Sequence, residues 1–432
     1  MAALLTRSAW LGALALLSGQ AGAADLSDRH GLAIELDWNL FDTRSSLSAW
    51  TEGGAGKLRF DAGNSDNASA RVAIEYRGQI TPTLFGRVVA DAIENAPSSA
   101  GLTEAYLEWR PLPSGVARNR LRFGAFYPPF SLENTGFAWE SPYSRSFSAI
   151  NTWLGEEIRP IGLDWRLSRP VGGERSPRRI DVFAGVFYGN DPAGTLLFWR
   201  GWSVHDRQTR LNERLPLAPL VLPGPPGGSP IVIERRLDPI AEIDDRPGIY
   251  LGGDLSLARR ARVSLAFYDN RADPYSFRDG QWSWGTRLWH FAAQVGLPGD
   301  IGLIVQHMRG DTEWLVPPTR DGSISPMTEH VTDEFDASFM LLSKSVGERH
   351  RVSLRFDIFD FKRPGEFEID RGDAATLAYS YSLKPRLTMQ LEWMQIESSR
   401  DIWPLLLGHA STRETESMLQ LGFRLSVFDS KG

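Results

Sequence analysis

The sequence contains no cysteine, so neither disulfide bonds nor thiolate metal sites can stabilise the fold. It also has very little lysine, because lysine stands only at positions 57, 344, 362, 384 and 431 and every other basic residue is arginine. The formal net charge of −6 argues against nucleic-acid binding. After the N-terminal region, no apolar run approaches the ~20 residues that a membrane-spanning helix needs. Packing or the closure of a sheet must therefore supply the stability.

The first residues have the pattern of a secretory signal peptide. One positive charge, Arg7, precedes an apolar run from Ala9 to Leu17, and small residues follow at Ala21 and Ala23. This pattern predicts a signal peptide over residues 1–23 and a mature chain over residues 24–432. The alternative interpretation is a buried N-terminal helix.

The rest of the chain repeats one pattern, in which apolar and polar residues alternate with the period of two that a pleated strand imposes. The copies lie at residues 32–40, 72–76, 84–92, 105–109, 121–127, 161–167, 180–186, 249–257, 263–267, 289–295, 301–309, 335–341, 352–358, 377–383, 387–393 and 417–428. Sixteen is an even number, as bacterial outer-membrane barrels of one chain require.

The segments between the copies are sorted by length. Those after the second, fourth, eighth, tenth and fourteenth copies are short, whereas most of those after odd-numbered copies are long. Short turns on one rim and long loops on the other are typical of an outer-membrane barrel. A soluble sandwich gives no reason for this sorting. We therefore predict an all-β transmembrane antiparallel barrel of about 16 strands, with periplasmic turns, extracellular loops and both termini on the periplasmic side.

The two faces of the predicted strands differ in charge. The apolar faces carry no charge, and we expect them to contact lipid, where an Arg or Lys costs ~2–4 kcal/mol near the midplane. In the twelfth strand the predicted lipid-facing row is Phe335, Ala337, Phe339 and Leu341. The opposite faces are predicted to line a water-filled lumen, because sixteen strands enclose more space than side chains fill. The predicted inward charges are Arg71, Arg77, Arg87, Arg120, Arg122, Arg166, Arg262, Arg355 and Arg424, with Glu35, Asp37, Glu75, Glu104, Glu108, Asp164, Asp254, Asp357 and Glu392.

The long segment after the fifth strand, residues 128–160, is rich in aromatic and charged residues and is expected to fold into the lumen. The stretch from Arg120 to Glu133 resembles the strand and loop start of phosphate-selective porins of the O and P type, and residues 148–159 belong to the same comparison. The resemblance covers roughly a tenth of the chain. It implies a trimeric sixteen-stranded channel in which a constriction loop and arginines of the wall guide anions.

The sequence departs from those porins in its lack of lysine and in its mixture of inward charges, which places phosphate specificity in doubt. A lumen lined by charges of both signs favours an electric field across the channel over a filter lined by charges of one sign. The candidate constriction residues are Arg120, Arg122, Arg145 and Arg159, expected to face Glu133, Glu156 and Glu157. The alternative is that these charges are structural salt bridges that pin the loop.

No other chemistry is indicated. The seven histidines are scattered singly, so their spacing suggests neither a zinc site nor a Ser-His-Asp triad. Asp244 and Asp245 could ligate calcium, although a solvated turn also explains them. The apolar, proline-rich residues 215–233 fit either a neighbouring subunit or the barrel mouth.

We therefore predict a non-enzymatic porin without a cofactor. It is expected to be a homotrimer in the outer membrane of a Gram-negative bacterium, in contact with lipid and passing small hydrophilic solutes or inorganic anions. An outer-membrane enzyme and a secreted soluble β-protein are the alternatives.

Overall fold

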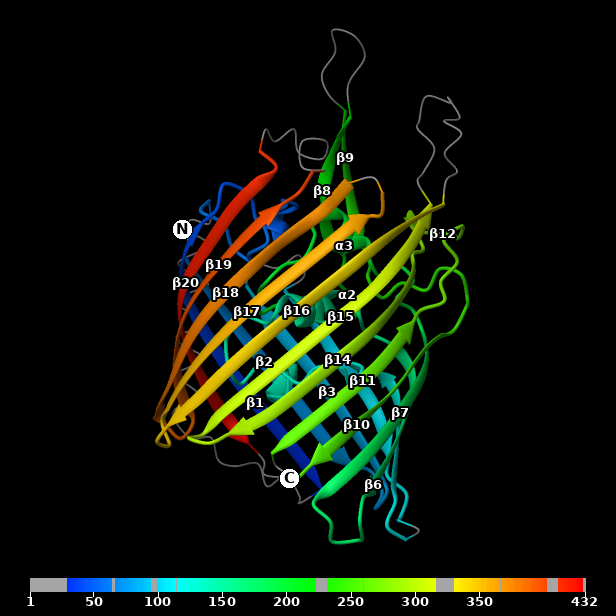
Figure 1. The fold of residues 1–432 in the computed structure, drawn as a ribbon, viewed down its shortest axis with the longest axis vertical. Coiled ribbons are helices and arrows are strands. Elements are labelled where there is room, and N and C mark those ends of the chain that lie inside the picture. Colours follow the sequence, from blue (N-terminus) through cyan, green and yellow to red (C-terminus); the bar gives the residue numbers. More distant parts are fainter. Residues whose placement is uncertain are drawn as a thin grey trace.

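The computed structural model describes residues 29–63, 67–94, 99–113, 115–222, 231–258, 260–315, 330–365, 367–401 and 411–429. The predicted signal peptide lies outside the described residues. Sixteen antiparallel strands form a closed barrel, which is the predicted fold (Figure 1). Its strands are β1 (His30–Arg44), β2 (Ala68–Gln79), β3 (Leu84–Ile93), β4 (Ala100–Trp109), β5 (Arg118–Ala125), β6 (Ile161–Pro170), β7 (Arg178–Tyr188), β10 (Gly248–Leu257), β11 (Ala261–Asp269), β14 (Gly285–Leu297), β15 (Ile301–Leu315), β16 (His330–Val346), β17 (His350–Arg363), β18 (Phe367–Lys384), β19 (Leu387–Ser399) and β20 (Arg413–Asp429).

Each barrel strand pairs with its neighbour in the chain, and β1 pairs with β20 to close the cylinder. Every predicted strand coincides with one of these sixteen. The register places His30 beside Gly78 and Ala33 beside Asp429, so the described ends of the barrel chain lie at the rim with the short turns. The predicted sorting of short and long connections is confirmed.

The outer wall is apolar and the inner wall is charged, because successive side chains of a strand point to opposite faces. Phe123, Leu251 and Leu354 are examples of exposed apolar residues of the outer wall. All eighteen predicted inward charges lie on the inner faces of their strands. None of the helices in the described part of the chain is long and apolar enough to cross a membrane.

The faces of β16 were predicted the wrong way round. Phe335, Ala337, Phe339 and Leu341 are buried inside the barrel, whereas Met340 is exposed on the outer wall. The reason is that a loop helix fills this side of the lumen, and the ring of Trp153 lies 5.3 Å from that of Phe335, centroid to centroid. An apolar inner row is stable here because it packs against protein rather than water.

Three connections on the long-loop rim fold into the barrel, although only one was predicted to do so. We name them L1 (residues 45–67), L3 (residues 126–160) and L4 (residues 189–247). L1 contains the short helix η1 (Trp50–Glu52), L3 contains η2 (Phe137–Trp139) and α2 (Ala149–Glu157), and L4 contains α3 (Thr195–Trp199). Buried side chains of all three loops form one apolar cluster with the inner wall, including Trp50, Trp153 and Trp202. The lumen is therefore much narrower than the strand number alone implies.

Two hairpins stand on the same rim. β12 (Phe277–Arg278) pairs with β13 (Gln281–Trp282), and β8 (Leu215–Leu222) pairs with β9 (Ile231–Leu237), which rises above the barrel in Figure 1. At the base of the second hairpin, Ala218 packs with Leu47 and Ala55 of L1. The described part of the apolar segment 215–233 thus contacts L1 of its own chain at the barrel mouth.

Candidate functional site

L3 crosses the lumen because its helix α2 is held at its N-terminus by the barrel wall. Ser148 caps the helix by accepting a hydrogen bond from the backbone amide of Asn151 at 3.3 Å. Two carboxylates lie at this end. Asp357 of β17 accepts from the amide of Ala149 at 3.0 Å, and Glu133 accepts from the amide of Ser148 at 3.0 Å. Negative charge at a helix N-terminus is stabilising, so the wall and the start of L3 fix the helix together.

The two carboxylates share one arginine of the wall. Arg355 of β17 donates to Glu133 at 2.9 Å and to Asp357 at 2.9 Å, and all three side chains are buried. Burying three charges is tolerable only when they are paired and hydrogen-bonded, as they are here. Glu133, a predicted constriction residue, is therefore a structural anchor of L3 on the wall.

L3 also carries a strained turn that directs Glu140 towards the wall. Ala138 and Trp139 adopt φ angles of 47° and 58°, in the left-handed region that costs non-glycine residues about 1–3 kcal/mol each. The turn is held because Gln208 of L4 donates to the Ala138 carbonyl at 2.8 Å and Trp139 stacks on Tyr127 at 4.0 Å. Next in the chain, Glu140 forms ion pairs with the wall.

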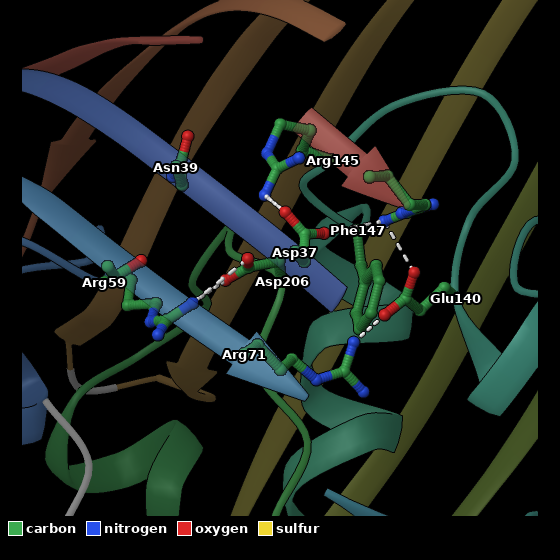
Figure 2. Close-up of a pocket in the computed structure, with 10 residues that line it drawn as sticks. Asp37, Asn39, Arg59, Arg71, Glu140, Arg145, Phe147 and Asp206 are labelled. Atoms are coloured by element: carbon green, nitrogen blue, oxygen red, sulfur yellow. Dashed lines mark hydrogen bonds and ion pairs between the residues drawn. The ribbon is translucent and has the colours of Figure 1, made fainter. Parts of the chain in front are cut away.

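The ion pairs of Glu140 belong to a charged cluster that joins L1, L3, L4 and three wall strands, shown in Figure 2. We call it the constriction cluster, and it consists of Asp37 (β1), Arg71 (β2), Arg424 (β20), Arg59 (L1), Glu140 and Arg145 (L3), and Asp206 (L4). These side chains surround a cavity of about 10 Å³, which is room for roughly one water molecule.

The contacts in the constriction cluster alternate in sign. Arg424 lies 2.5 Å from Glu140 and 3.3 Å from Asp37, and Arg71 also pairs with Glu140. Arg145 pairs with Asp37 at 2.6 Å. Separately, Arg59 of L1 pairs with Asp206 of L4 at 2.9 Å (Figure 2). The pKa of Asp206 falls to about 2 because the Arg59 and Arg145 charges outweigh the effect of burial.

The C-terminal half of α2 is tied to L4. Glu156 accepts two hydrogen bonds from Arg200, at 2.8 and 2.6 Å, and lies 3.0 Å from Nε2 of His205. Burial raises the pKa of Glu156, but the charge of Arg200 and the contact with His205 outweigh it and lower this pKa to about 2. Glu156 therefore stays ionised and holds L4 against L3.

Glu157 also ties α2 to L4, through backbone amides of L4. Its carboxylate accepts from the amides of Gly194 and Leu196, at 3.1 and 3.0 Å, and from the indole of Trp153. Burial raises the pKa of Glu157 to about 7 in spite of these donors. Gly194 and Leu196 lie at the start of α3, so Glu157 ties the start of α3 to the end of α2.

Arg159 ends L3 on the wall. Its guanidinium donates to the carbonyls of Thr103 and Gly155 and to the hydroxyl of Tyr127, over whose ring it lies at 3.6 Å from the centroid. Its backbone amide donates to Asn190 at 2.9 Å. Arg159 has no carboxylate partner among its described contacts, and burial lowers its pKa.

Arg120 and Arg122 lie on the inner face of β5, in the half of the barrel with the short turns. Arg122 pairs with Asp164 of β6 at 2.8 Å, whereas Arg120 keeps 30% of its side-chain surface exposed and lies 3.6 Å from Asp164. Beside them is an open space of about 450 Å³ that we call the arginine vestibule. Its lining includes Arg110, Arg118, Arg120, Arg166, Arg179 and Asp181.

The predicted facing pairs are wrong, because none of the four candidate arginines contacts Glu133, Glu156 or Glu157 in the described contacts. The partners come instead from the wall and from L4, namely Asp37, Asp164, Arg200, His205 and Arg355. Asp37, Asp164 and Arg355 were predicted to point inward from strand alternation. Nothing in the sequence indicated Arg200 and His205, because L4 was not expected to enter the barrel.

Three carboxylates of the wall and L3, those of Glu35, Asp37 and Glu140, lie within 4.8 Å of one another. Their charge is neutralised by arginines, since Arg424 contacts all three at 3.1, 3.3 and 2.5 Å. Arg71 and Arg145 add further pairs. This group therefore needs no metal ion.

Comparison with solved structures supports the fold. The outer membrane channel DcaP of Acinetobacter baumannii is similar over 92% of this chain and 96% of its own, with 11% sequence identity and a TM-score of 0.53. The anion-selective porin from Comamonas acidovorans is similar over 92% of this chain and 99% of its own, with 12% sequence identity and a TM-score of 0.47. The outer membrane protein OmpT of Vibrio cholerae is similar over 92% of this chain and 97% of its own, with 8% sequence identity and a TM-score of 0.48. Neither a protein-family model nor a curated protein sequence matches the chain. The likeness to DcaP over nearly the whole of both chains therefore supports the outer-membrane barrel fold.

Proposed function

We propose that this protein is an outer-membrane channel for the passive diffusion of small hydrophilic solutes. The observation that carries the proposal is a closed barrel of sixteen strands with an apolar outer wall and a charged inner wall. Such a barrel places lipid-compatible side chains outside and encloses more space than its own inner side chains fill. We further propose that it lies in the outer membrane of a Gram-negative bacterium as a homotrimer, as the resemblance to phosphate-selective porins implies.

The three inward loops restrict the solute to a small size. L1, L3 and L4 meet in the constriction cluster, whose cavity of about 10 Å³ is bordered by alternating charges. Fixed charges of both signs around a narrow passage create a transverse field that favours polar solutes over apolar ones. Movement of these loops would widen the passage between them.

Anions are the favoured solutes in this proposal because arginine exceeds carboxylate on the inner wall of β2 to β7. The arginines are Arg71, Arg77, Arg87, Arg110, Arg118, Arg120, Arg122, Arg166 and Arg179, against Glu75, Asp91, Glu104, Glu108, Asp164 and Asp181. A surplus of positive charge around a wet cleft concentrates anions there. This sector includes the arginine vestibule, so anions would gather in the half of the barrel with the short turns.

The test is the reversal potential of the purified protein in planar bilayers under a potassium chloride gradient. Wild type is expected to prefer chloride, and the double variant Arg120→Gln/Arg166→Gln is expected to shift the potential towards potassium. Arg287→Gln is the matched control, because Arg287 is exposed on the outer wall near the start of β14 and pairs with Asp311 at 3.0 Å.

A wild-type preference for potassium would refute the anion assignment. Absence of conductance from protein that shows heat-modifiable gel mobility would refute the channel. Release into the soluble periplasm instead of the membrane fraction would favour a secreted β-protein.

A further inference from the structure

A second cluster of carboxylates, outside the constriction, lies where L4 leaves and rejoins the barrel on the long-loop rim. Asp191 follows the end of β7, while Glu242 and Asp244 lie shortly before β10. One oxygen of each carboxylate lies within 4.8 Å of the other two. Three negative charges this close repel one another unless a cation joins them.

The cluster has one buried oxygen atom without a partner. The side chain of Asp191 is fully buried, and its Oδ2 accepts from the amide of Asp244 at 3.2 Å and from that of Ile243. Its Oδ1 has no hydrogen-bond partner in the described part of the chain. Leaving a buried charged oxygen unpaired is costly, so a cation bound at Oδ1 would stabilise this carboxylate.

Nearby arginine does not neutralise the cluster as it does around Glu140. Arg246 lies 3.9 Å from Asp244, but it is half exposed and its closer partner is Asp273 at 2.8 Å. The hydrogen bonds of Glu242 come from the backbone amides of Gly189 and Asp245, at 2.6 and 2.7 Å. Arg278 is also exposed, and it donates to the Glu242 carbonyl at 3.2 Å and pairs with Asp245 at 2.8 Å. The site thus combines three carboxylates with two exposed arginines, whose closest carboxylate partners lie outside the cluster.

We propose that Asp191, Glu242 and Asp244 bind a divalent metal ion, with calcium favoured over magnesium. Carboxylate oxygens suit hard cations of this kind. Calcium binds oxygen at ~2.3–2.6 Å, so three oxygens that all lie within 4.8 Å of one another can share one ion. Magnesium demands near-ideal octahedral geometry and usually keeps several of its waters, so a site of three protein carboxylates suits calcium better.

The bound ion would brace L3 as well as L4. Asn190, next to Asp191, donates to the Glu157 carbonyl at 2.6 Å and to the Pro239 carbonyl at 2.9 Å, and accepts from the Arg159 amide. The ion therefore joins the two ends of L4 at the point where α2 ends. This role is independent of what the channel passes.

Terbium, which replaces calcium, is the probe for this site. Trp284 donates its backbone amide to the Asp191 carbonyl at 2.7 Å, so its indole is close enough to sensitise a bound lanthanide. The protein is refolded in detergent, stripped with a chelator and titrated with terbium under tryptophan excitation, and then with calcium as competitor. We expect saturable emission and displacement by calcium at a Kd of ~10⁻⁴–10⁻³ M, the range of extracellular modules.

We expect Asp244→Asn to weaken terbium binding at least threefold. The double variant Glu242→Gln/Asp244→Asn is expected to weaken it at least tenfold. Glu397→Gln, which removes an exposed acid near the same rim, is the control and should bind as wild type does. Heat-modifiable mobility verifies that each variant is folded. The proposal is refuted if wild type shows no saturable calcium-displaceable emission, or if folded Asp244→Asn binds within threefold of wild type. Conductance plays no part in this readout, so its result is separate from that of the channel test.

Discussion

The ion pair between Glu156 of α2 and Arg200 of L4 permits a quantitative prediction. Glu156→Gln keeps the shape of the side chain but leaves Arg200 buried without a countercharge. Losing one partner of a buried pair costs about 3–5 kcal/mol. The pKa of Glu156 gives an independent value, because its displacement from 4.5 to about 2 corresponds to about 3 kcal/mol. Both figures predict that L4 detaches from α2 far more often in the variant.

The assay is limited trypsin digestion of the folded barrel in detergent, with cleavage mapped by mass spectrometry. About 3 kcal/mol raises the population of the detached loop roughly 150-fold, and cleavage after Arg207 and Arg210 follows that population when reclosing is fast. Both arginines are buried in the wild type. Single-channel conductance should rise and become noisier, because L4 borders the constriction.

The control is Arg287→Gln, which breaks an ion pair of similar length on the outside of the barrel. Exposed pairs contribute about 0–1 kcal/mol, so cleavage in the control should change less than about fivefold. If Glu156→Gln is cleaved within threefold of wild type and conducts as wild type does, the buried pair does not hold L4.

Two further predictions concern acid and the inner face of β16. Since the pKa of Glu156 is lower in the folded protein than in the unfolded chain, its contribution is complete above pH 4.5 and is lost as the pH falls towards 2. The midpoint of heat-modifiable unfolding should fall over that interval in wild type, and less in Glu156→Gln. Phe335→Ala removes a buried ring against Trp153 and should destabilise the barrel by about 3–5 kcal/mol, measured by urea-induced unfolding in detergent. Met340→Ala, on the lipid side of the same strand, should cost much less, and equal losses would contradict the assignment of the faces.

The barrel could be predicted from the sequence because the alternation of apolar and polar residues in a strand is visible within a short stretch of the chain. Alternation of period two needs only a few neighbouring residues, and it located all sixteen strands and the inward charges. The exception, β16, has apolar residues on its inner face because α2 packs there. Its alternation is as regular as that of the other strands, so periodicity alone assigns the two faces without saying which one meets lipid.

The candidate site was less predictable because its contacts join distant parts of the chain. Strand alternation placed Asp37 and Arg355 inside, yet their partners in L3 are 108 and 222 residues away in the sequence. A local pattern does not encode which inward charge meets which loop. The entry of L4 was missed for the same reason, since the buried pair of Glu156 and Arg200 joins the end of α2 in L3 to the end of α3 in L4.

The seam between β1 and β20 sets an order for assembly. These two strands are adjacent in space and nearly four hundred positions apart along the chain, as in the pairing of Asp37 with Arg424. Until β20 pairs with β1, both edge strands of the sheet have unpaired backbone amides and carbonyls, which can pair with other molecules. Arg424 also supplies charge to Asp37 and Glu140, so the step that seals the cylinder also completes the constriction cluster.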